Sequence, residues 1–439
     1  MSKTGINRPC ECGSGKKFKL CCMTQEEKIS ERARFQFQYP DEIFNGYNEF
    51  VNSGVEKLSP KEEDMHCDPV VDNWWEGFMP LYKRMDIDRM LPLIYGFMAE
   101  HPEKFHELGL HEECLFELAP AMDKLGRSGE YITLLEKIRL EFSETYRKVY
   151  GALDSSIIEY KVSLGTAHDI IPSLDNFMSC QQSDDNYIEE VLDLLAIAGR
   201  KTELKILSEK IYPHCEYAME KLFYLIYEPY LADRNSSNEA VLAIAESMKT
   251  YNFMDEVTDK DVIAAKLKNM AEYYAPFDFS VLSGKTMIAE EYYGLGERFT
   301  GFLAHDIGCS AIAALQLSKY VDRYIFFLLS KIKSKTPFVF NKTHLENFIV
   351  SEFKAFFYVK AIPATAFVQS IIYFHRFMNN LDGAPKSDLD MIVRESQEIY
   401  SMLRKCSTER VSCVERIFWT FPNFKGTVMD EPETSKANR

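Results

Sequence analysis

Four cysteines near the start of the chain most constrain what its first residues can fold into. Cys10 and Cys12 stand one residue apart, and the adjacent pair Cys21 and Cys22 follows eight residues later. The segment is too short and too polar to bury four thiols in a core of its own. Thiolates bind Zn²⁺ in a closed tetrahedral shell, and such a shell is structural rather than catalytic. We therefore predict one structural zinc ion held by the four thiolates of Cys10, Cys12, Cys21 and Cys22.

The residues around these cysteines also resemble a known motif. Gly13-Ser14-Gly15 supplies the backbone freedom for a tight reversal between the two pairs. The run from Pro9 to Cys22 resembles the SEC-C zinc motif, best known from the C-terminal tail of the SecA preprotein translocase ATPase. That form usually ends Cys-His, whereas this run ends in two cysteines, and a second thiolate binds zinc as well as an imidazole does. In SecA-like tails the knob docks on the chaperone SecB, and related modules associate with ribosomes, so the resemblance implies a docking module.

The charge of this zinc knob, residues 1–23, supports a docking role. The knob holds five basic side chains and one acidic one, whereas the whole chain has a net charge of −16. A basic knob on an acidic body would be steered toward an acidic surface of a protein or an RNA. Alternatively, the lysines only balance the metal site, because four thiolates leave it with a charge of about −2. The residues that we expect to dock are Arg8, Lys16, Lys17, Phe18 and Lys19.

Composition places the rest of the chain among globular proteins, and we expect the protein to be cytoplasmic and bacterial. Its length of 439 residues predicts two or three domains beyond the knob, and 46% apolar residues exclude disorder for the bulk. The acidic net charge argues against a broad nucleic-acid-binding surface on the body. No signal-peptide pattern stands at the start, so we expect the other seven cysteines to be reduced and buried. The most apolar segment, 307–329, is interrupted by Lys319, Asp322 and Arg323, which predicts a buried helix and no membrane span.

A repeating pattern of turns and helices is predicted for residues 70–255, after a tether and lead-in helix at 24–69. Gly96, Gly129, Gly165 and Gly199 recur every 33 to 36 residues, and amphipathic segments follow three of them. Such a period is typical of a helix–turn–helix solenoid and resembles tetratricopeptide repeats, although the Trp and Tyr positions of that family are not filled. Chance alignment of glycines is the alternative. The first core contacts of this region are expected from Trp74, Trp75, Phe78 and Tyr82.

Residues 256–420 are predicted to form a helical C-terminal domain without this period, followed by a flexible tail at 421–439. We expect one helix to end at the paired glycines Gly294 and Gly296, and three buried helical segments at 299–333, 343–360 and 364–379. No alternating strand pattern is present. The sequence therefore predicts an all-α fold: a solenoid-like helical-repeat body with a small N-terminal zinc knob and a non-repeating helical C-terminal region.

No set of catalytic residues is evident, so an enzyme is not the first hypothesis. The pair His305-Asp306 is similar to the metal-binding dyad of HD phosphohydrolases, but the further ligands that those enzymes need cannot be assigned. We expect an adaptor whose knob docks on a chaperone or ribosome and whose repeat groove holds a second protein or peptide. The alternatives are an enzyme or effector with its active site in the C-terminal region, targeted by the knob, and a self-assembling structural protein that the knob merely caps.

Overall fold

The structure, a computed structural model, describes most of residues 68–406. The gaps are 111–113, 144–145, 147–152, 165–169, 180–184, 213–214, 252, 254–258, 278, 280–288, 333, 335–336 and 354–360. Within the described residues the secondary structure is helical, without strands, so the predicted all-α fold is confirmed. The zinc knob, nearly all of the tether and the C-terminal tail lie outside the described residues.

The first helices enclose a hydrophobic core of their own. They are α4 (Pro69–Tyr82), α5 (Ile87–Glu100), the 3-10 helix η3 (Pro102–Leu108), α6 (Cys114–Lys124) and α7 (Ser128–Glu141). Helix α4 begins where the Asp68 side chain accepts a hydrogen bond from the Val70 N–H, with a proline in the first turn. The rings of Trp74 and Phe78 stack with their centroids 4.4 Å apart, and Phe78 is fully buried. Trp75 and Tyr82 pack against the same core, which confirms the predicted core contacts.

A second, larger core begins within α9 and runs to the end of the described chain. Ile157 belongs to the first core and the adjacent Ile158 to the second, and both are fully buried. Helix α9 is therefore covered on two sides and joins the two cores. The helices of the larger core are α9 (Asp154–Ser163), α10 (Ile171–Ser179), α11 (Asp185–Ile197), α12 (Lys201–Ile211), α13 (Glu216–Ala232), α14 (Asn238–Thr250), α15 (Lys260–Ala271), α16 (Ala289–Phe302), α17 (Ala311–Phe327), α18 (Lys342–Glu352), α19 (Ala361–Asn380) and α20 (Leu389–Cys406).

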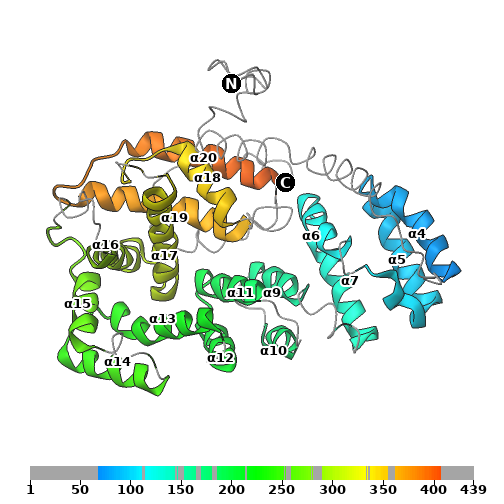
Figure 1. The fold of residues 1–439 in the computed structure, drawn as a ribbon, viewed down its shortest axis with the longest axis horizontal. Coiled ribbons are helices and arrows are strands. Elements are labelled where there is room, and N and C mark those ends of the chain that lie inside the picture. The colour runs from blue at the N-terminus through cyan, green and yellow to red at the C-terminus, as the bar shows by residue number, and fades with distance from the viewer. Residues whose placement is uncertain are drawn as a thin grey trace, which may run out of the picture.

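Helix α17 lies inside this larger core. Helices α4–α7 form one end of the molecule, α9–α16 follow along one side, and α17–α20 lie beside them (Figure 1). Helix α17 contacts α11, α13, α16 and α19, and its segment is the one that the sequence marks as most apolar. Helix α20 packs on α19 and also reaches back to α6. Among the described residues, no helix combines the length and apolarity that a membrane crossing requires.

The predicted repeat stays a prediction. Gly199 lies in the turn between α11 and α12, but Gly96 lies inside α5 and marks no turn, and Gly165 lies outside the described residues. The domain division predicted at residue 255 also stays a prediction. The larger core includes side chains from both sides of this residue.

Two predictions for the C-terminal region are wrong. Helix α16 does not end at Gly294 and Gly296 but continues to Phe302. Its glycines permit close packing: a Cβ on Gly296 would meet the Asp322 carboxylate at 2.6 Å, and one on Gly301 would meet the Met270 carbonyl oxygen at 2.0 Å. The segment 299–333 is not one helix either, because a π-helical turn, η7 (Leu303–Ile307), ends at Gly308 before α17 begins. A second π-helical turn, η8 (Leu328–Ile332), follows α17.

We predict that Gly301→Ala destabilises the larger core. The added methyl group would overlap the Met270 carbonyl of α15, so the two helices must separate, at a cost of about 1–3 kcal/mol. Gly96→Ala is the matched control, because this helical glycine has no neighbour within 4 Å of an added Cβ. That control should stabilise by about 0.5–1 kcal/mol. The midpoints of urea unfolding measure the stability of both variants. Equal shifts of the midpoint in Gly301→Ala and Gly96→Ala would contradict the close contact.

Candidate functional site

The site residues predicted from the sequence lie outside the described residues. These are the proposed zinc ligands Cys10, Cys12, Cys21 and Cys22 and the proposed docking residues Arg8, Lys16, Lys17, Phe18 and Lys19. Where the chain is described, two groups of polar side chains stand out. One is a buried charged network around α17, and the other is a cluster at the π-helical turn η7.

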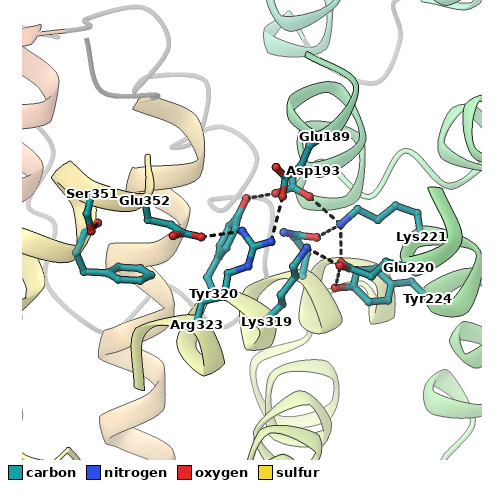
Figure 2. A network of polar contacts seen from close by, with 12 residues as sticks. Glu189, Asp193, Glu220, Lys221, Tyr224, Lys319, Tyr320, Arg323, Ser351 and Glu352 are labelled. Carbon is teal, nitrogen blue, oxygen red and sulfur yellow. Dashed lines mark hydrogen bonds and ion pairs between the residues drawn. The ribbon is translucent and has the colours of Figure 1, made fainter. Parts of the chain in front are cut away.

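Lys221 on α13 is the centre of the buried network (Figure 2). Its side chain has no exposed surface, and its Nζ lies 2.7 Å from Asp193 Oδ1 of α11 and 2.9 Å from Glu220 Oε1. It also donates a hydrogen bond of 2.5 Å to Gln316 Oε1 of α17. A lysine buried in this way remains charged only because carboxylates surround it.

Helix α17 adds further partners to the same carboxylates. Lys319 Nζ lies 2.6 Å from Glu220 Oε2, and the Tyr320 hydroxyl donates to Asp193 Oδ2 over 3.0 Å. The Tyr224 hydroxyl of α13 donates to Glu220 over 2.6 Å. The carboxylates of Asp193 and Glu220 therefore each accept hydrogen bonds from side chains on two helices. These bonds fix α11, α13 and α17 relative to one another.

Arg323 extends the network to the surface, one turn further along α17. Its guanidinium lies 3.1 Å from a Glu189 oxygen of α11 and 2.8 Å from a Glu352 oxygen of α18 (Figure 2). Residues 316, 319, 320 and 323 are spaced so that they share one face of a helix. The polar face of α17 thus ties three neighbouring helices together.

The pKa values follow from this arrangement. Burial opposes ionisation of Glu220, but Lys221 and Lys319 outweigh it and hold the pKa of Glu220 well below its ordinary value. Burial also opposes the charge of Lys221, yet Asp193 and Glu220 raise its pKa. Burial lowers the pKa of Lys319, and the positive charge of Lys221 lowers it further. The network therefore keeps Glu220 ionised at neutral pH.

The charges of this network satisfy one another, which indicates a structural role. A catalytic group must face a substrate, whereas these side chains face their own ion-pair partners. Sequence reasoning did not find the network, although one signal was present. Lys319, Asp322 and Arg323 interrupt the most apolar segment of the chain, and charges in a buried helix need partners. The partners lie too far away in sequence for any local pattern to name them.

The second cluster surrounds Asp306 in η7. The hydroxyls of Tyr273 and Tyr274 donate to the two oxygens of this carboxylate over 2.5 and 2.7 Å. Burial, and then these bonds to Asp306, raise the pKa of both tyrosines to about 12. His305 stacks on the Tyr273 ring, and its buried Nε2 has no hydrogen-bond partner. The described residues hold no group of three or more His, Cys, Asp or Glu side chains that could bind a metal ion, so the dyad gains no further ligands there.

The fold and these sites define an all-α protein with a charged network inside its larger core. The comparison with known families adds one local finding: residues 7–24 match the SEC-C motif, which confirms the resemblance seen around the four cysteines. No curated protein and no solved structure matches the chain.

We predict that Lys221→Met strongly destabilises the protein. The change leaves Asp193 and Glu220 buried without their shared cation, at a cost of about 3–5 kcal/mol. Lys201→Met is the control, because the Lys201 side chain is 53% exposed and its pair with Glu228 contributes at most about 1 kcal/mol. Adding Asp193→Leu to Lys221→Met should recover part of the loss, because it removes one unpaired charge. Denaturant unfolding measures all three, and a Lys221→Met effect as small as the control would contradict the assignment.

A pH dependence is expected from His375 on α19, which is 3% exposed and pairs through Nδ1 with the Ser387 hydroxyl at 3.0 Å. Burial lowers the pKa of His375 to about 4, whereas an unfolded histidine has a pKa of about 6.5. The unfolded chain therefore binds the proton first as the pH falls. The stabilisation by neutral His375, at most about 3 kcal/mol, is present above pH 6.5 and lost toward pH 4. Between pH 6.5 and pH 4 the melting temperature of His375→Gln should fall less steeply than that of the wild type. Parallel curves of melting temperature against pH for the two proteins would contradict the prediction.

Proposed function

We propose that this protein is an adaptor whose N-terminal SEC-C motif docks on a protein or ribonucleoprotein partner. The match to the SEC-C motif at residues 7–24 carries the proposal. In this proposal one structural Zn²⁺ is held by the thiolates of Cys10, Cys12, Cys21 and Cys22, a donor set that suits a closed zinc shell. The metal would give a fixed shape to a segment that has no core of its own.

The chemistry of the motif suggests the kind of partner. Arg8, Lys16, Lys17 and Lys19 would meet an acidic surface, and Phe18 would add an apolar contact. A SecB-like chaperone or a ribosome is the partner that the resemblance suggests, in a bacterial cytoplasm.

In our proposal the motif docks on a partner and does not merely cap the body. The described helices form two hydrophobic cores between Val71 and Leu403, and the motif ends more than forty residues before the first of these side chains. In our proposal the helical body, repeat-like between residues 70 and 255, presents a second surface to another protein or peptide.

The test uses the full chain with the four motif cysteines changed to serine. The wild-type protein should contain one zinc per chain under reducing conditions, and the serine variant none. Cys67→Ser, which lies outside the motif, is the control and should keep the metal. Partners captured by the wild type and the control should be lost with the serine variant. Capture of the same proteins by all three would refute docking through the knob, whether or not zinc is present.

A second candidate is an enzyme or effector that the knob targets. One observation favours it: η7 places the unpartnered His305 Nε2 beside a shared carboxylate, and π-helical turns occur frequently at functional sites.

A further inference from the structure

The first core is incompletely covered at the end of the molecule where the described chain begins (Figure 1). Eight hydrophobic side chains of the described chain are partly buried against this core, and six of them lie on α4 and α5. They are Val70, Trp74, Trp75, Leu81, Tyr82 and Tyr95. Helix α4 packs mainly on α5 and η3, whereas α9 at the other end of this core is shared with the larger core. Within the described chain, the open side of the first core is therefore the side of α4.

Four apolar side chains form one continuous surface on that side, which we call the open face: Trp74, Trp75 and Met79 of α4 and Leu93 of α5. The Trp74 indole N–H donates to the Leu93 carbonyl oxygen over 3.2 Å, and the ring centres of Trp74 and Trp75 lie 5.2 Å apart. Trp75 and Met79 are four residues apart, so they share one side of α4. Met79 is 36% and Leu93 37% exposed, and both tryptophans are half-buried. A continuous apolar surface, unlike a single exposed leucine, indicates a docking site.

The segment 41–57, shortly before α4, has the sequence of a helix that needs a partner. Its apolar residues at 43, 44, 47, 50 and 51 recur at helical spacing and fall on one side, and the polar residues at 45, 48, 49 and 52 fall on the other. Gly46 and Gly54 weaken such a helix in isolation, and a segment of this length is marginal in water even with good helix formers. The sequence therefore indicates a helix that forms when its apolar side packs on another element.

The chain between this segment and α4 is long enough for the segment to reach the open face. Residues 58–67 span at most about 35 Å when extended, whereas α4, with its 14 residues, is about 21 Å long. The segment can therefore turn back and lie antiparallel beside α4, as helices joined by a connection do. A tethered segment also acts at a high effective concentration, which favours it over a second copy of the chain or a free peptide at this surface.

We propose that residues 41–57 form an amphipathic helix whose apolar side packs on the open face. This helix completes the first core, as a terminal element caps a stack of helices. The free chain between the SEC-C motif and the body is then residues 25–40 in place of 25–67, which limits how far a partner on the knob can stand from the body. The packing does not require metal binding by the motif and goes beyond the proposed adaptor function.

Hydrogen exchange of the full chain tests this packing from the side of the open face. The amides of 41–57 should be protected in the wild type. Met79→Glu/Leu93→Glu should speed their exchange by about tenfold or more, because it places two charges in the apolar contact. Leu125→Glu/Leu140→Glu is the matched control, at two leucines that are 57% and 82% exposed on other helices or turns of the same core, and should leave this exchange unchanged. Equal protection of the larger core in all three proteins shows that the variants are folded.

Tryptophan fluorescence tests the same packing from the side of the segment. The chain has three tryptophans, so Trp419→Phe leaves Trp74 and Trp75 as the reporters. In this background Phe44→Asn/Phe50→Asn should shift the emission to longer wavelength and increase quenching by acrylamide, because water reaches the two indoles. Asn48→Ser/Asn52→Ser, on the polar side of the same segment, is the control and should change neither quantity.

Three results would overturn the proposal. Wild-type amides of 41–57 that exchange at the rate of an unfolded chain would show that no helix forms there. Protection that Met79→Glu/Leu93→Glu leaves unchanged, or emission that Phe44→Asn/Phe50→Asn leaves unchanged, would place the helix on another surface. A wild-type dimer in sedimentation that Met79→Glu/Leu93→Glu converts to a monomer would show that a second copy covers the open face. The pull-down of the knob partners should be the same for all these variants, so failure here is distinct from failure of the proposed adaptor function.

Discussion

The buried charge of Lys221 is the constraint on which the larger core depends. An ammonium group without exposed surface is costly unless carboxylates meet it from the right directions. Asp193 of α11 and Glu220 of α13 do so, and α17 supplies Gln316, Lys319 and Tyr320 to complete their hydrogen bonds. These contacts have direction, which apolar packing lacks. We infer that they select one arrangement of α11, α13 and α17 out of several that apolar contact alone would permit.

The apolar faces of α17 complete this arrangement. Its buried residues include Leu317, Val321 and Ile325, and it packs on α16 and α19 as well as on the charged helices. The close approach of α16 to α15, which Gly301 permits, brings η7 and Asp306 beside the two tyrosines at the end of α15. Helix α16 packs on both α15 and α17, so it lies between the cluster at the π-helical turn and the helix that carries Gln316, Lys319 and Tyr320.

Sequence reasoning reached those parts of the fold that local patterns determine. Helical periodicity without an alternating strand pattern predicted the all-α class, and the high apolar content of 307–329 indicated the buried helix that α17 forms within this segment. The aromatic residues from Trp74 to Tyr82 proved to be core contacts. It failed where packing between helices far apart in sequence determines the helix ends and the side-chain partners. Gly294 and Gly296 suggested a helix end because the close neighbour Asp322 cannot be seen in a local pattern. Lys221 and Gln316, or Tyr274 and Asn380, are likewise partners only in three dimensions. The cysteine motif was recognisable because all its residues lie within one short segment.

The chain therefore has two levels of organisation: a short cysteine motif that its own residues identify, and a body whose order depends on one buried lysine. Amide hydrogen exchange of the full chain tests the central claim about the body most directly. The amides of α11, α13 and α17 should be the slowest to exchange and should open together, since the charged network couples these helices. If α17 exchanges as fast as the outer helix α14, or independently of α13, the network does not organise the core.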